Sequence, residues 1–145
     1  MHVYADTSII FSLCHPGDIF FEQVNRKHKR LRPLIIYPPW LRFEARHILN
    51  ARRQDEDGEM AWRALLAAER FFMGSRENWL AVIQQAGLLS ARHGRDIVCG
   101  GMDVLHVASA VHFGADEFWT GDSDQAAFAR LSGLSVVDFS KVPSA

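Results

Sequence analysis

Short apolar runs alternate with longer amphipathic stretches along the chain, and this alternation predicts its secondary structure. Four short runs predict strands, at residues 3–5, 33–37, 117–120 and 134–138. The stretches between them predict helices at residues 7–13, 17–31, 40–53, 59–73, 79–93, 102–113 and 123–131. Strands that alternate with helices are typical of an α/β fold in which helices flank a mostly parallel sheet.

Polar and glycine residues mark the boundaries of these elements. Residues 54–58 predict a polar break, Asn78 is expected to cap the helix that follows it, and Gly94, Gly114 and Gly133 predict helix ends. No repeat, low-complexity tract or linker interrupts the pattern. We therefore expect residues 1–145 to form a single domain.

The composition narrows the class of protein. The 145 residues are 48% hydrophobic and 23% charged, which is ordinary for a globular domain. A net charge of -1 gives no global basic field, so a nucleic acid would have to meet a local patch. Cys14 and Cys99 form no CxxC pair, which argues against a zinc site or a disulfide framework. No membrane span or secretion signal is visible, and we expect a cytoplasmic protein.

Two acids occupy positions in apolar helical patterns. In the helix predicted at residues 40–53, Glu44 falls inside a stripe that should face the core, formed by Trp40, Phe43, His47, Ile48 and Ala51. A carboxylate on such a stripe needs a partner. Asp103 begins the almost wholly apolar stretch MDVLHVASAVHF. It either favours the dipole of that helix or serves a site.

Asp6 and Asp122 share a different context, because each follows a short predicted strand and precedes a helix. The carboxyl ends of parallel strands meet at one edge of the sheet, so the two acids should lie on the same rim. Helix capping is the alternative role for Asp6, although Thr7 and Ser8 could also cap. Asp124 would either serve the same site or cap a helix that begins near Ala126.

Carboxylates gathered on one rim repel each other, and this repulsion indicates a bound cation. At about 6 Å and an effective dielectric constant near 20, each pair of like charges costs roughly 3 kcal/mol. No Lys or Arg adjoins Asp6, Asp103 or Asp122 in the sequence. Oxygen ligands without a His or Cys cluster favour Mg²⁺ or Mn²⁺.

The order of these residues resembles the PIN-domain family, in particular the VapC-type toxin ribonucleases of bacterial toxin–antitoxin modules. The resemblance rests on Asp6-Thr-Ser8 after a strand, a helical Glu44, MDVLHVASA around Asp103, and WTGDSD around Asp122. It implies a three-layer fold with a sheet of four or five short strands, and Mg²⁺- or Mn²⁺-dependent cleavage of RNA.

The resemblance also assigns roles. Asp6, Glu44, Asp103 and Asp122 would form the catalytic cluster, in which Asp6, Asp103 and Asp122 hold the metal. The supporting residues would be Ser8, Thr120 and Asp124. A cognate antitoxin and a homodimer are implied as partners, whereas residues 55–95 carry no matching signature.

Contacts with the RNA backbone need cations outside the acidic cluster. The best local patch is a basic run formed by Arg26, Lys27, Lys29, Arg30 and Arg32, which would otherwise be a solvated helix face. Further candidates are Arg42, Arg46, Arg52 and Arg53, each of which could instead balance a nearby acid. Trp40 and Trp119 could stack on bases or fill the core. His106 could reach the site or pack within its helix.

Three other classes remain open at this stage. The first is an inactive PIN-like module that binds RNA or protein, and the presence of all four acids argues against it. The second is a phosphoryl-transfer enzyme with an aspartyl nucleophile at Asp6, although Ser8 stands where such enzymes usually carry a second acid. The third is a structural α/β domain whose acids only cap helices.

Overall fold

The structure is a computed structural model that describes residues 1–74 and 79–141. Its strands are β1 (His2–Ala5), β2 (Leu34–Tyr37), β3 (Met73–Gly74), β4 (Glu117–Thr120) and β5 (Val136–Asp138). Its α-helices are α1 (Thr7–Cys14), α2 (Phe21–Leu31), α3 (Pro39–Ala51), α4 (Glu56–Ala68), α5 (Trp79–His93), α6 (Gly101–His112) and α7 (Ser123–Leu131). Two 3₁₀ turns, Glu69–Phe71 and Phe139–Lys141, complete the described elements.

The strands form a single parallel sheet in the order β3-β2-β1-β4-β5. The chain starts at the central strand β1, builds outward to β2 and β3, and then returns to the other side of β1 to build β4 and β5. The strand order therefore reverses between β1 and β4. Open α/β sheets place their ligands at the carboxyl ends of the strands at such a reversal.

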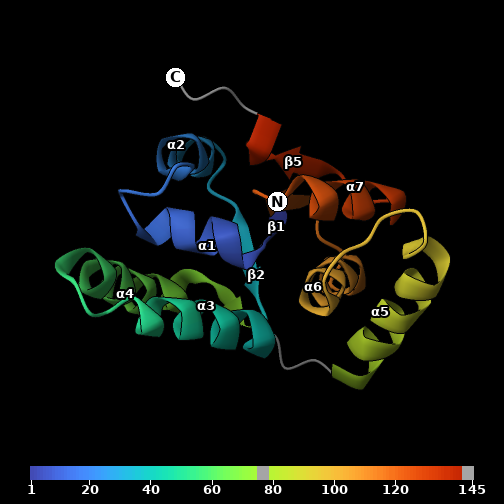
Figure 1. Cartoon of the computed structure of the whole chain (residues 1–145). Helices are drawn as coiled ribbons and strands as arrows, with labels where there is room; N and C mark the ends of the chain where they lie inside the picture. The colour runs from blue at the N-terminus through green and yellow to red at the C-terminus, as the bar shows by residue number, and fades with distance from the viewer. Residues whose placement is uncertain (75–78, 142–145) are drawn as a thin grey trace.

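Helices cover both faces of the sheet, which gives the expected three layers. Helices α1 to α4 pack on one another, as do α5 to α7. Figure 1 shows the first group to the left of the sheet and the second to the right. The central strands are fully buried between these layers, because both of their faces carry large apolar side chains such as Tyr4, Ile36, Phe118 and Trp119.

The expected α/β class and its parallel sheet are confirmed, but several boundaries differ. The second helix begins at Phe21 rather than at residue 17. Helix α4 begins at Glu56, because the side chain of Asp55 accepts a hydrogen bond from the backbone N–H of Gly58. Helix α4 ends at Ala68. Met73, which the sequence pattern predicted as the end of this helix, belongs instead to β3 and pairs with Ile36 of β2. The expected cap at Asn78 lies outside the described residues.

The apolar stripe predicted on α3 is wrong in its register. Leu41, Ala45 and Leu49 face the core together with Trp40. Phe43, which was expected inside, is 71% exposed. Glu44 consequently lies at the margin of the buried face, where a carboxylate can reach both protein partners and solvent.

Two simpler expectations concern cysteines and membranes. Cys14 and Cys99 are both free, the first buried and the second half-buried. Within residues 1–74 and 79–141, no helix combines the length and the apolar character that crossing a bilayer requires.

Candidate active site

All four predicted acids line one small cavity of about 140 Å³, which we call the acid cavity. Asp6, Glu44, Asp103 and Asp122 reach it from four separate parts of the chain. The cavity lies where β1 and β4 end, because Ala5 pairs with Trp119 and the N–H of Asp6 donates to the carbonyl of Trp119 at 3.0 Å. The expectation that Asp6 and Asp122 share one rim is therefore confirmed.

Asp6 forms the buried floor of the acid cavity and is 5% exposed. Its Oδ1 accepts hydrogen bonds from the Ser8 hydroxyl at 2.6 Å and from the Ile9 N–H at 3.0 Å, while its Oδ2 accepts from the Thr120 hydroxyl at 2.6 Å. Burial raises the pKa of Asp6, and these hydrogen bonds oppose that rise. Ser8 and Thr120 thus support the first acid, as the sequence predicts.

Asp103 and Asp122 lie at the starts of α6 and α7. Asp103 Oδ2 accepts from the Gly100 N–H at 3.0 Å, and Asp122 Oδ1 accepts from the N–H groups of Asp124 and Gln125 at 2.8 and 3.0 Å. The Gln125 amide also reaches Asp103 Oδ1 at 3.3 Å and so links the two acids. Burial, and then the neighbouring charge of Asp122, raise the pKa of Asp103.

Capping and membership of the cavity are therefore not alternatives for these three aspartates. Asp6 caps α1, Asp122 caps α7, and Asp103 binds the backbone at the start of α6. Three helix N-termini consequently meet the cavity with the positive ends of their dipoles. These ends offset part of the repulsion between the carboxylates. The sequence had indicated only a bound cation as the source of that offset.

Glu44 enters from α3 and is fixed by two donors. Its Oε2 is contacted by the Thr7 hydroxyl and by His106 Nε2, the latter at 2.7 Å. The hydrogen bond from His106 lowers the pKa of Glu44, which keeps the carboxylate ionised. Both contacts are to Oε2, so Oε1 is the oxygen left to meet water or a cation.

Gly121 allows the chain to turn tightly between Thr120 and Asp122. A Cβ atom at this position would lie 2.5 Å from a ring carbon of Phe20 and 3.2 Å from the Ser8 hydroxyl. The Gly121 N–H donates to that hydroxyl at 3.2 Å. The glycine of the WTGD sequence therefore lets β4 deliver Asp122 beside Ser8.

Some predicted residues lie outside the acid cavity. Asp124 does not line it and does not cap a helix, because α7 begins at Ser123 with Asp122 as its cap. Its contribution is a backbone N–H to Asp122. The helix predicted at residues 123–131 is confirmed, whereas the start near Ala126 that would make Asp124 its cap is wrong.

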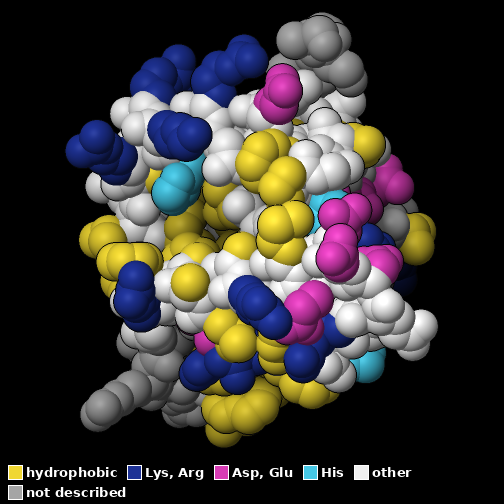
Figure 2. All heavy atoms as spheres, turned by 90° about the vertical axis from the view of Figure 1, so that its left-hand side faces the viewer, with side chains coloured by type: hydrophobic (Ala, Val, Ile, Leu, Met, Phe, Trp, Pro, Cys, Tyr) yellow, Lys and Arg dark blue, Asp and Glu magenta, His cyan; other side chains and the backbone are white. Residues whose placement is uncertain are grey.

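The basic run lies at the opposite edge of the sheet. Arg32 ends α2 just before β2 begins, and Lys27 binds Glu117 at 3.1 Å, where β4 begins. Both contacts are at the amino ends of parallel strands, whereas the acids lie at the carboxyl ends. Figure 2 shows Lys and Arg side chains gathered in the upper part of the face seen there, at the height of α2 in Figure 1. RNA contact by this run remains a prediction.

Arg42 and Arg46 take the structural role that the sequence left open. Both bind Glu69, whose side chain is 8% exposed, and Arg46 Nε donates to Glu69 Oε1 at 2.7 Å. The Tyr37 hydroxyl also donates to Glu69, at 3.2 Å. We call these four residues the Glu69 cluster. Arg53 similarly binds Glu59 at 2.8 Å, and Trp40 and Trp119 belong to the core.

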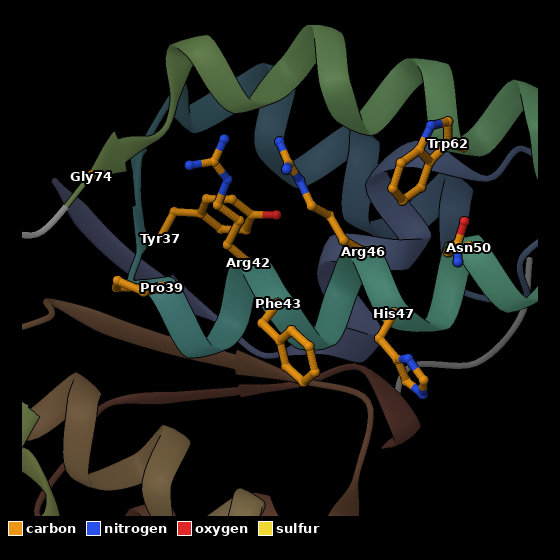
Figure 3. A pocket seen from close by; sticks show the side chains of 9 residues that line it. All are labelled: Tyr37, Pro39, Arg42, Phe43, Arg46, His47, Asn50, Trp62 and Gly74. Carbon is orange, nitrogen blue, oxygen red and sulfur yellow. The ribbon is translucent and has the colours of Figure 1, made fainter.

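The Glu69 cluster borders a second, larger cavity of about 710 Å³. Figure 3 shows Arg42 and Arg46 directed from α3 toward α4, while Phe43 and His47 leave the opposite side of α3. The rings of Phe43 and His47 stack with centroids 6.0 Å apart. Helix α3 therefore lines one cavity with aromatic and basic side chains and contributes Glu44 to the acid cavity.

Sequence reasoning missed two residues that line the acid cavity, Thr7 and Gln125. Thr7 was considered only as a possible cap, and Gln125 was not singled out. His106 was expected either to reach the site or to pack within its helix. It is packed, at 2% exposure, and it also binds a site acid. Its position one helical turn after Asp103 was the signal available in the sequence.

The donor set suits a hard divalent cation, but the side chains do not close around one. Within residues 1–74 and 79–141, no three His, Cys, Asp or Glu residues converge as ligands of a single metal ion. The acid cavity nevertheless combines four carboxylates with no Lys or Arg among its described lining residues. This arrangement fits a largely hydrated Mg²⁺, which proteins usually hold through one or two carboxylates and several waters.

Comparisons with known proteins find similarity in structure rather than in sequence. No protein-family profile matches the chain. No curated protein matches it either. Solved structures do resemble it. VapBC2 from Rickettsia felis, bound to a promoter DNA fragment, has a TM-score of 0.67 and 15% identity, covering 95% of this chain and 98% of that one.

Two further structures extend this likeness. VapC20 from Mycobacterium tuberculosis, described as a toxin that cleaves the sarcin-ricin loop, has a TM-score of 0.67 and 20% identity over 86% of this chain and 93% of that one. VapBC-1 from nontypeable Haemophilus influenzae has a TM-score of 0.62 and 19% identity over 97% and 100%. The chain therefore has the PIN-like, three-layer fold of VapC structures.

Proposed function

We propose that this protein is a metal-dependent endoribonuclease that hydrolyses RNA phosphodiester bonds, and that it is the toxin of a toxin–antitoxin pair. The observation that carries the proposal is the meeting of Asp6, Glu44, Asp103 and Asp122 in one cavity at the strand-order reversal. The fold shared with VapC structures supports the same reaction class, since one of them is a toxin that cleaves RNA at the sarcin-ricin loop.

Mg²⁺ or Mn²⁺ would be held by Asp6, Asp103 and Asp122, directly or through water. When bound, such an ion lowers the pKa of a coordinated water and neutralises charge on the phosphoryl oxygens. Asp6 is pre-oriented for this role by Ser8 and Thr120, which bind both of its oxygens. Asp122 is the most exposed of the four acids.

Glu44 orients the attacking water in this proposal. Its lowered pKa keeps it ionised, and its Oε1 is free of the contacts that hold Oε2. Attack by water rather than by the 2′-hydroxyl would leave a 5′-phosphate and a 3′-hydroxyl on the products.

A catalytically inactive PIN-like module that binds RNA or protein is the second candidate. One observation favours it. The described acids accept hydrogen bonds from helix N-termini and hydroxyl groups, and no three of them lie close enough together to bind one metal ion. Such an arrangement would also serve a protein that keeps the fold and has lost the reaction.

A cognate antitoxin is the proposed protein partner. Two of the similar structures are VapBC complexes by name. The 710 Å³ cavity beside α3 offers exposed aromatic surface, including Phe43, on which a partner segment could pack. A homodimer and a cytoplasmic location remain predictions from the sequence.

The proposal is tested by incubating the purified protein with a mixed RNA pool in Mg²⁺, and in parallel with EDTA. We expect new RNA ends in Mg²⁺ and none in EDTA, and mass spectrometry should identify 5′-phosphates and 3′-hydroxyls. Cyclic 2′,3′-phosphates would reject hydrolysis by water. Intact RNA in both samples, with RNA retained in a binding assay, would favour the inactive module.

A further inference from the structure

A continuous chain of hydrogen bonds runs from the core of the protein to Glu44 in the acid cavity. Trp40 Nε1 lies 3.3 Å from the Tyr4 hydroxyl oxygen, that oxygen lies 2.9 Å from His106 Nδ1, and His106 Nε2 lies 2.7 Å from Glu44 Oε2. Tyr4 and His106 are almost completely buried, at 0% and 2% exposure. The proposed reaction assigns no role to this chain of hydrogen bonds.

The direction of the bond to Glu44 follows from what each group can do. An ionised carboxylate can only accept, so His106 Nε2 must carry a proton to bind Glu44. On the other side of the ring, His106 Nδ1 faces the Tyr4 hydroxyl, which can donate or accept. The single Trp40 N–H is shared between the Tyr4 oxygen at 3.3 Å and the Ser109 hydroxyl at 3.0 Å.

A ring without a proton on Nε2 would be costly at this distance. The lone pair of Nε2 would then face the Glu44 carboxylate at 2.7 Å. Two acceptors would lie in contact, and the buried Nε2 would lose its hydrogen bond.

We propose that His106 is a positioning residue that holds Glu44 in the acid cavity through the N–H of its Nε2. In its catalytic consequence this inference rests on the proposed ribonuclease function. His106 lies one turn after Asp103 on α6, whereas Glu44 is on α3, so its hydrogen bond sets the distance between acids that two different helices carry. A second bond joins the same helices, from Trp40 Nε1 to the Ser109 hydroxyl at 3.0 Å.

The proton on Nε2 is measured directly by two-bond ¹H–¹⁵N correlation spectra of the wild-type histidine side chains at neutral pH. We expect His106 to show a protonated Nε2. An unprotonated Nε2 would overturn the inference. This measurement needs no nuclease activity, so it can fail or succeed independently of the proposed function.

The positioning role is measured by RNA cleavage with three variants. His106→Leu should lower kcat about 10- to 100-fold with KM changed less than about twofold, the scale of loss for residues that orient metal-site groups. His106→Gln should recover part of kcat, since its amide can both donate to Glu44 and accept from Tyr4. His93→Leu makes the same substitution on α5, at a histidine that does not line the acid cavity, and this control should cleave as the wild type does.

The two tests separate the possible failures. If the wild type cuts RNA and His106→Leu, folded by circular dichroism, cuts equally well, the positioning role is wrong while the proposed function stands. If His106→Leu does not fold, equal loss of kcat in His106→Gln and Glu44→Gln would still contradict rescue by the amide. If the wild type cuts nothing but shows a protonated Nε2 on His106, the hydrogen bond to Glu44 stands and the ribonuclease proposal fails.

Discussion

Helix α3 contributes side chains both to the Glu69 cluster and to the acid cavity, and the carboxylates of these two places differ in their surroundings. Glu69 is bound by Arg42 and Arg46 and by the Tyr37 hydroxyl. The acid cavity, by contrast, holds four carboxylates and has no Lys or Arg among its described lining residues. The charge of Glu69 is balanced by Arg42 and Arg46, which belong to the protein. The acid cavity has no such partners among its described lining residues, so its charge would be balanced by a cation from solution.

The pKa of Glu69 moves in the opposite direction to those of two aspartates of the acid cavity, Asp6 and Asp103. Burial would raise the pKa of Glu69, but the guanidinium groups of Arg46 and Arg42 lower it below its ordinary value. Burial raises the pKa of both Asp6 and Asp103, and neighbouring acids raise that of Asp103 further. A carboxylate that keeps its charge in such a place at a cost in stability is a candidate for chemistry rather than for structure.

The largest expected effect comes from comparing an aspartate of the acid cavity with an aspartate that only caps a helix. Asp103→Asn should reduce RNA cleavage in Mg²⁺ by more than about 100-fold, because it removes a charge on which cation binding depends. Asp55→Asn makes the same substitution at the cap of α4, outside the cavity, and should leave cleavage within about twofold of the wild type. Initial rates on one defined RNA measure both, and equal rates for Asp103→Asn and the wild type would show that the cavity is not the active site.

Stability should respond in the opposite order. Glu69→Gln should lower the free energy of unfolding by about 1–2 kcal/mol, since it weakens charged hydrogen bonds that remain partly exposed on the arginine side. Asp103→Asn should raise the free energy of unfolding in EDTA at pH 7, because it removes a carboxylate whose charged form is destabilised by burial and by neighbouring acids. Urea unfolding of both variants gives the two values, and the same sign for both would break the comparison.

The pH dependence follows from the signs of these shifts. The stability that Glu69 contributes is present above the pKa of an unfolded glutamate and is lost as the pH falls through its lowered, folded pKa. For Asp103, whose pKa is raised, the penalty is present at neutral pH and disappears as the pH falls toward 3.8. In a series of urea melts from pH 7 to pH 3, the free energy of unfolding of each variant should therefore approach that of the wild type. Glu69→Gln should approach it from below and Asp103→Asn from above.

The smallest expected effect concerns the basic run on α2. The double variant Arg26→Ala and Arg30→Ala should leave kcat unchanged, because these residues lie at the edge of the sheet opposite the acids. If they contact the RNA backbone, the slope of log binding constant against log salt should become shallower by about 1.4. An unchanged slope would show that this run is a solvated helix face.

The sequence allowed the fold class and the acids to be predicted because both depend on local patterns. An acid directly after a parallel strand must lie at the carboxyl edge, whatever the details of packing, and Asp6 and Asp122 do. Helix faces were harder to predict. Phe43 was expected in the core and is exposed, because the register of α3 is set by Leu41, Ala45 and Leu49 packing on other helices.

Long-range hydrogen bonds were beyond sequence reasoning. The contact between His106 and Glu44 joins residues 62 positions apart and depends on how α3 crosses α6. The strand at Met73 was missed for a similar reason, because its two residues form a strand only by pairing with β2. In each case the deciding partner lies in another element, and no pattern along the chain indicates it.

The central claim is that carboxylates from distant parts of the chain form one divalent cation site, and titration calorimetry with Mn²⁺ tests it most directly. The wild type should bind Mn²⁺, and the folded Asp6→Asn plus Asp103→Asn double variant should not, whereas Asp55→Asn should bind as the wild type does. Binding of Mn²⁺ by the double variant with the affinity of the wild type would contradict the claim, as would a wild type that binds no Mn²⁺ at all.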